Sequence, residues 1–115
     1  MKIFFVTILF ILSVNVYGVK TVQTYKGMYV WGHEVNTFRS CGSKTEYWIS
    51  AADSVLAPLV KYYEGNTTKS YQAIYVVFRG YKMNKATDGF AADYPGVIKI
   101  LEVKMRRLKA PGKCH

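Results

Sequence analysis

The sequence predicts a mainly β domain with one helix, in the order β-β-β-α-β-β. Three observations favour this fold class. Long stretches are rich in aromatic and β-branched residues, one stretch carries apolar residues at helical spacing, and turn-forming residues cluster between them. Hydrophobic residues make up 50% of the 115 and tyrosine occurs 10 times, so the chain can bury one modest core.

The first residues, MKIFFVTILFILSVNVYG, have the three parts of a secretory signal peptide. Lys2 precedes an apolar run about half as long as the ~20 residues that a membrane-spanning helix needs. We therefore expect cleavage after Gly18, which makes residues 1–18 the signal peptide and residues 19–115 an exported domain with its core at 25–115. The domain would be periplasmic or secreted; a retained membrane anchor is the weaker alternative.

Both cysteines, Cys41 and Cys114, lie in the exported part. Two cysteines in an oxidising compartment predict one disulfide that ties the early part of the domain to its C-terminal end. Closing a loop of that length would stabilise the fold by roughly 4 kcal/mol. The alternative of two free reactive thiols is less favoured, because neither lies in a Cys-x-x-Cys pair.

The first strands are expected within residues 27–40, GMYVWGHEVNTFRS, after a short polar lead over 19–26. Gly32 interrupts the stretch, and a glycine inside a strand indicates a bulge or a tight bend. The third strand is expected at residues 46–50, EYWIS, after the turn CGSK.

Residues 51–66 are predicted to form the helix. Asp53 or Ser54 would cap its start, and Pro58 is tolerated if it lies in the first turn. Gly65 suits a left-handed C-cap. The apolar stripe that faces the core consists of Val55, Leu56, Leu59, Val60 and Tyr63.

The last two strands are expected at residues 71–83 and 97–108, separated by a loop with the turn pairs Asp-Gly and Pro-Gly. Residues 109–113 are irregular up to Cys114. Three strands, one helix and two strands make up the order of a small five-stranded OB-type barrel. Periodicity also leaves an α+β roll open.

The resemblance to a known family rests on short strings spread along the exported chain: GHE at 32–34, TF at 37–38, CG at 41–42, YW at 47–48, YV at 75–76, RG at 79–80, DGFAADY at 88–94 and GV at 96–97. Together with Cys114 they resemble the C-terminal OB domain of the NlpE-type bacterial envelope lipoproteins, here as a free-standing exported domain. The resemblance implies an OB-type barrel in the envelope without catalytic activity. Copper response and stress signalling do not follow, because the Cys-x-x-Cys domain and the lipid-attachment cysteine of those lipoproteins are missing.

His33, Glu34 and Cys41 lie close together in sequence and raise the question of a metal or catalytic site. The other histidine is the terminal His115, and adjacent strand residues point to opposite faces. We therefore expect Gly32 to bend the strand, His33 or Glu34 to meet a neighbouring loop, and Cys41 to hold the tail. No metal, no cofactor and no enzyme activity are expected.

The net charge of +9 favours acidic partners, although solubility explains it equally well. The leading hypothesis is a monomeric binding or accessory module for an envelope protein or an anionic ligand. The alternative is an OB-fold binder of anionic oligomers, either polysaccharide or single-stranded nucleic acid, through a basic aromatic face. Export disfavours nucleic acid. The residues proposed for this face are Tyr29, Trp31, Arg79, Tyr81, Phe90, Asp93, Tyr94, Arg106 and Arg107.

Two parts of this predicted face have competing interpretations. Phe90 and Tyr94 could form an aromatic ledge with Asp93 as an acceptor; in the structural alternative Phe90 closes the barrel end, Asp88 and Asp93 cap backbone N–H groups, and both loop glycines have positive φ. Arg106 and Arg107 could contact anionic lipid headgroups, or could be a solvated strand end.

Overall fold

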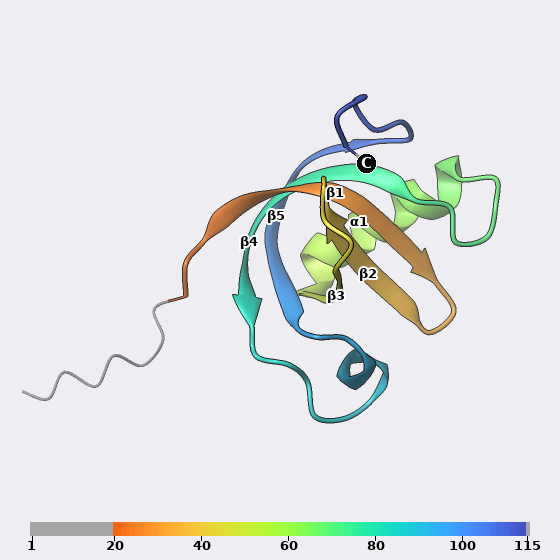
Figure 1. The fold of residues 1–115 in the computed structure, drawn as a ribbon. Helices are drawn as coiled ribbons and strands as arrows, with labels where there is room; N and C mark the ends of the chain where they lie inside the picture. Colours follow the sequence, from red (N-terminus) through yellow and green to blue (C-terminus); the bar gives the residue numbers. More distant parts are fainter. Residues whose placement is uncertain (1–19, 115) are drawn as a thin grey trace, which may run out of the picture.

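The computed structural model describes residues 20–114 as a five-stranded sheet with one long helix and one short 3-10 helix (Figure 1). The predicted signal peptide at residues 1–18 lies outside the described residues. No helix in the described part of the chain has both the length and the apolar character needed to cross a membrane.

The order of the elements confirms the predicted β-β-β-α-β-β succession. A single helix separates the third strand from the fourth, and a 3-10 turn lies in the loop between the last two strands. The elements are β1 (Gln23–Gly32), β2 (Val35–Ser40), β3 (Glu46–Ala51), α1 (Asp53–Asn66), β4 (Ile74–Met83), η1 (Phe90–Asp93) and β5 (Val97–Arg107).

The five strands form one sheet that closes into a ring in the order β1-β2-β3-β5-β4, with β4 paired back to β1 (Figure 1). The β3–β5 pair is parallel and brings Ile49 opposite Ile98, whereas the four other pairs are antiparallel. A parallel pair needs a long connection. Here α1 and β4 together supply it.

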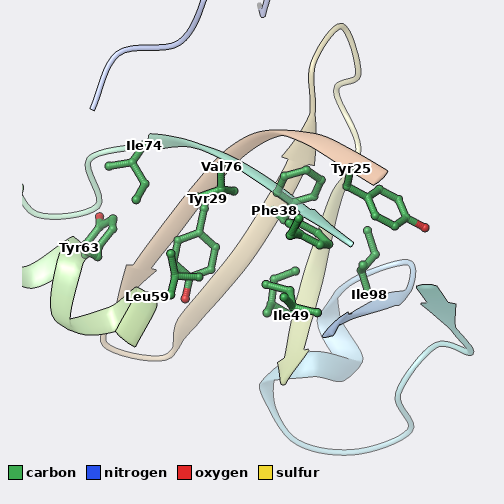
Figure 2. Close-up of a cluster of buried hydrophobic side chains, with 11 residues drawn as sticks. Tyr25, Tyr29, Phe38, Ile49, Leu59, Tyr63, Ile74, Val76 and Ile98 are labelled. Atoms are coloured by element: carbon green, nitrogen blue, oxygen red, sulfur yellow. The ribbon is translucent and has the colours of Figure 1, made fainter. Parts of the chain in front are cut away.

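Strand alternation directs one side of each strand into the closed sheet, where aromatic side chains pack together (Figure 2). The centroids of Phe38 and Phe78 lie 4.8 Å apart at an interplanar angle of 72°. Helix α1 closes one end of this core with Leu59 and Tyr63. The fully buried side chains therefore come from all five strands and the helix.

A buried polar pair lies within this core. The hydroxyl of Tyr29 donates to Asn36 Oδ1 at 2.7 Å, and Asn36 Nδ2 donates to the carbonyl of Ile49 at 3.3 Å. Buried polar groups cost free energy unless they are paired. These hydrogen bonds satisfy the phenol and the amide and fix β1, β2 and β3 relative to one another.

The first hairpin differs from the sequence prediction. β1 begins at Gln23 rather than at residue 27, because the polar lead pairs with β4 and places Gln23 opposite Gly80. Gly32 marks neither a bulge nor a bend inside a strand. It pairs with Val35, so that His33 and Glu34 form the two-residue turn between β1 and β2.

The ends of α1 also differ from the prediction. The helix starts after Ala52 without a side-chain cap, and Pro58 lies beyond the first turn. Gly65 lies inside the helix and not in a left-handed C-cap. Instead, the backbone N–H and Oγ1 of Thr67 both donate to the carbonyl of Tyr63, at 3.0 and 2.7 Å, which satisfies that terminal carbonyl.

The predicted disulfide between Cys41 and Cys114 is confirmed, with a sequence separation of 73. Cys41 follows β2, and its backbone N–H donates to the carbonyl of Lys26 at 2.8 Å. The segment after β5 therefore returns to the start of the sheet, where Cys114 is buried. A disulfide fits the expected export of the chain.

Candidate functional site

The residues proposed for a basic aromatic face do not form one surface. Tyr29 has an exposed fraction of 0% and belongs to the core, so it cannot contact a ligand on the surface. Burial raises the pKa of its phenol well above the usual value, with a smaller contribution from Tyr63. Tyr81 is also buried, and the ammonium of Lys20 lies 5.0 Å from its ring centroid.

Two of the three proposed arginines on β4 and β5, Arg79 and Arg106, contact other groups within the fold. Arg79 forms an ion pair with Glu102 at 3.6 Å, and Glu102 also contacts Lys104 at 3.1 Å. Arg107 is exposed and pairs in register with Tyr75 at the far end of the β4–β5 ladder.

Arg106 ties the last strand to the helix. Its guanidinium lies 4.7 Å from the ring centroid of Tyr62, and its Nη1 donates to the carbonyl of Pro58 at 3.3 Å. A guanidinium above an aromatic ring is a cation–π contact that stabilises by about 0.5–1 kcal/mol at exposed sites. Arg106 therefore has a structural role between β5 and α1.

Phe90, Asp93 and Tyr94, the residues of the expected ledge, lie in η1 or directly after it. The ring of Tyr94 lies 5.6 Å from that of Trp48 on β3, and Lys85 Nζ donates to the carbonyls of Ala92 and Tyr94. Phe90 is 51% exposed, so the prediction that it closes the end of the ring is wrong.

The end of the ring near η1 is covered by Tyr47 instead. Tyr47 packs against the core, and a β-carbon at Gly96 would lie only 3.1 Å from its ring. Gly89 has the expected positive φ of 67°, but Gly96 does not. The tight contact with Tyr47, rather than a positive φ, therefore explains why a glycine occupies position 96.

The ledge is not basic. Burial raises the pKa of Tyr94, and the carboxylates of Glu46 and Asp93 raise it further. Since both carboxylates act on the phenol, the ledge carries negative charge where an anionic ligand would stack. The ammonium of Lys85 is already engaged by the loop carbonyls.

A different surface has the geometry of a binding site. A cleft of about 660 Å³ lies where the β1–β2 turn meets the loop between α1 and β4, two segments on the same side of the sheet (Figure 1). We call it the aromatic cleft. Its lining consists of Trp31, Gly32, His33, Tyr63, Glu64, Thr67, Thr68, Lys69, Ser70 and Tyr71.

Hydrogen bonds hold the two walls of the aromatic cleft together. Trp31 Nε1 donates to Glu64 Oε1 at 3.3 Å, which joins β1 to α1. The hydroxyl of Tyr63 donates to the carbonyl of Gln72 at 2.5 Å. Burial raises the pKa of Tyr63, and a hydrogen bond with the Trp31 backbone partly offsets this. Tyr63 therefore contacts both walls.

The loop wall of the cleft is ordered by one amide side chain. Gln72 Oε1 accepts the backbone N–H groups of Thr68 and Lys69 at 3.0 and 3.3 Å. Tyr71, which precedes Gln72, has a φ of 58°. This backbone conformation costs a non-glycine residue about 1–2 kcal/mol. Its side chain is 53% exposed, and its ring lies against Gly32.

The turn on the opposite wall corrects another expectation. His33 and Glu34 do not point to opposite faces, because they lie in the turn and their side chains meet at 3.1 Å. Glu34 also has a positive φ, of 60°. Among residues 20–114, no group of three or more His, Cys, Asp or Glu side chains could hold a metal ion.

Sequence reasoning placed Trp31 on a ligand face but missed the other residues of this cleft. Tyr71 was assigned to the fourth strand, which begins only at Ile74. The polar stretch NTTKS before Tyr71 is a loop signal that could have extended the loop through this tyrosine. Nothing in a local pattern shows that such a loop meets the β1–β2 turn.

Comparison of the chain with models of protein families, with curated proteins and with solved structures finds no match. The arguments for a function therefore come from the geometry of the chain itself.

Proposed function

We propose that this chain is a non-enzymatic, exported binding module of OB type, in the manner of the NlpE-type envelope domains it resembles, and that it binds its ligand in the aromatic cleft. The ring order β1-β2-β3-β5-β4 and the position of α1 between β3 and β4 support the OB assignment. The disulfide between Cys41 and Cys114 supports export.

The observation that carries this proposal is the conformation of Tyr71. A bulky residue with positive φ is strained, and such strain is concentrated at functional sites. Glycine would avoid this strain, and the core does not need the ring, since more than half of Tyr71 is exposed. A ligand that contacts the ring explains why an aromatic residue occupies this position.

The position of the cleft fits the same proposal. OB folds bind their ligands with the face of the second and third strands and the loops next to it, including the loop between the first two strands. In this chain that loop supplies His33, and the strand before it supplies Trp31. The loop after α1 supplies the opposite wall.

The test is nuclear magnetic resonance of the ¹⁵N-labelled domain with a panel of ligands: a neutral disaccharide, a sulfated heparin disaccharide, choline, a single-stranded oligonucleotide and a glutamate-rich peptide. We expect at least one to shift the amides of Gly32 and Tyr71. The Trp48→Phe variant leaves Trp31 as the one tryptophan, so its fluorescence gives a second signal. If none of these ligands perturbs the cleft, the proposal is wrong.

The second candidate function is binding of anionic oligomers, and the charge of the chain favours it. The ammonium of Lys82 lies 5.1 Å from the ring centroid of Tyr47. A cation and an aromatic side chain are therefore adjacent at the end of the closed sheet near η1. Phosphate or sulfate binding of this kind weakens steeply with salt. If an anionic ligand shifted only the amide resonances of Lys82, Arg106 and Arg107, and salt abolished those shifts, this candidate would be favoured over the cleft.

A further inference from the structure

We infer that the ligand of the aromatic cleft is a neutral sugar, whose ring stacks on Tyr71 and whose hydroxyl groups bind the polar lining. This inference rests on the proposed function and specifies its ligand class. Its basis is the combination of an exposed aromatic ring, a high density of hydroxyl groups and balanced charge in one cleft.

The aromatic part of the cleft supplies a surface for stacking. The ring of Tyr71 lies against Gly32 and is still about half exposed. Trp31, in the same lining, is only partly buried and packs against the core. A pyranose ring carries C–H groups on its flatter faces, and aromatic side chains offer large, rigid contact surfaces at low entropic cost.

The polar part of the cleft matches a ligand with many hydroxyl groups. Ser70 contributes a hydroxyl, which both donates and accepts hydrogen bonds, and Thr68 contributes a second, which also donates to Gln72 Oε1 at 3.5 Å. Trp31 occupies one oxygen of the Glu64 carboxylate, and the second oxygen has further acceptor capacity. A few polar groups around an apolar surface are the usual means of orienting a small ligand.

The charges of the lining decide against ionic ligands. Glu64 and Lys69 are its one carboxylate and one ammonium, so their formal charges cancel within a chain of net charge +9. An anionic ligand would face the Glu64 carboxylate. A cationic ligand would face Lys69 and the repulsion of the whole chain. A neutral polar ligand meets neither penalty.

The cleft is also organised before any ligand binds. Gln72 fixes the loop through two backbone N–H groups, while Tyr63 donates to the Gln72 carbonyl and packs edge to face against Tyr29 of β1. The strained backbone of Tyr71 is thus held by its neighbours. A ligand that binds a preorganised site avoids the free-energy cost of ordering the loop.

The experiment titrates the Trp48→Phe protein with maltose and with N,N′-diacetylchitobiose, and uses choline and heparin disaccharide as cationic and anionic comparisons. The readouts are Trp31 fluorescence and the amide shifts of the cleft. We expect at least one neutral disaccharide to bind there and to lose at least tenfold in affinity in Tyr71→Gly. That variant keeps the fold, because glycine adopts the φ of 58° without strain.

Phe90→Ala is the matched control, since it removes a similarly exposed aromatic ring that is not part of the cleft lining. It should bind the neutral sugar as the parent does. Neutral-sugar binding that survives Tyr71→Gly, or that falls equally in Phe90→Ala, overturns the stacking inference. If choline or heparin disaccharide shifts the cleft and neutral sugars do not, the sugar inference fails while the proposed function stands. If no ligand shifts the cleft, both fail.

Discussion

The ring of Tyr71 lies so close to Gly32 that a β-carbon at position 32 would stand 2.5 and 2.8 Å from two of its ring atoms. The two residues lie far apart in the sequence. One follows α1, and the other ends β1. A glycine at position 32 thus leaves room for an aromatic ring. The strand-like sequence around it does not show this role.

The Gly32→Ala substitution tests this contact. The new methyl group must displace the Tyr71 ring, which we expect to weaken ligand binding in the aromatic cleft by tenfold or more. The free energy of unfolding should fall by about 1 kcal/mol or less, because an exposed side chain can rotate away. Fluorescence titration of Trp31 and urea denaturation measure the two effects separately.

Gly65→Ala is the matched control for that experiment. Gly65 lies inside α1, and no heavy atom lies within 4 Å of the place where its β-carbon would be. Alanine there should raise the free energy of unfolding by about 0.5–1 kcal/mol and leave binding unchanged. Equal binding by the Gly32→Ala protein and its parent would contradict the role given to the Tyr71 ring.

Glu34→Gly should stabilise the β1–β2 turn. Glu34 has a φ of 60°, and relief of this conformation is worth about 1 kcal/mol after the entropic cost of glycine. The lost contact with His33 is exposed to solvent and contributes little. Urea denaturation should show a higher midpoint with the same slope, and Glu34→Val should show a lower one. A lower midpoint for the glycine variant would refute the strain at this turn.

Loss of the disulfide should destabilise the fold strongly. The bridge between Cys41 and Cys114 closes a loop with a sequence separation of 73, which is worth about 4 kcal/mol in the chain-entropy treatment. The double variant Cys41→Ser/Cys114→Ser and the reduced parent should show the same loss in urea denaturation. An unchanged midpoint after reduction, with thiol titration showing that both sulfurs are free, would disprove this contribution.

Alkaline pH should weaken the fold through Tyr29. Burial raises the folded-state pKa of this phenol above its ordinary value of 10.0, so the unfolded chain releases the proton first. The stabilisation is complete below pH 10 and is lost as the pH rises above it, by about 1.4 kcal/mol per pH unit for one proton. Tyr63 and Tyr94 have raised pKa values and add to the loss.

The Tyr29→Phe variant isolates the contribution of this residue. It loses the hydrogen bond to Asn36 and should be less stable at neutral pH. Its free energy of unfolding should nevertheless fall less steeply than that of the parent between pH 10 and pH 11. Parallel profiles for the two proteins would show that Tyr29 does not titrate differently in the folded and unfolded states.

Local patterns predicted the order of the elements well, because each strand and the helix carries its own periodicity. The start of β1 was missed for a non-local reason: Gln23 is in a strand because β4 pairs with it. The helix end was missed because Gly65 was assumed to take a left-handed conformation, whereas Thr67 satisfies the terminal carbonyl of Tyr63. The boundaries of β1 and α1 thus depend on hydrogen-bond partners that cannot be identified from the local sequence.

The candidate site was less predictable than the fold. Alternation along β1 shows that Tyr29 and Trp31 share a side of the strand, but not that this side faces the core. The side chain of Tyr29 is therefore inside the ring, whereas Trp31, near the strand end, reaches the cleft. The role of Tyr71 depends on a loop contact with Gly32 that arises only in three dimensions.

The position of β5 between β3 and β4 has a consequence for how the chain is made. Until Val97–Arg107 has been synthesised, β3 and β4 each present an uncovered hydrogen-bonding edge. Such edges recruit strands from other molecules. Nascent or prematurely terminated chains are therefore prone to aggregate, and a chaperone that shields β3 and β4 until β5 has been made would raise the yield of finished protein.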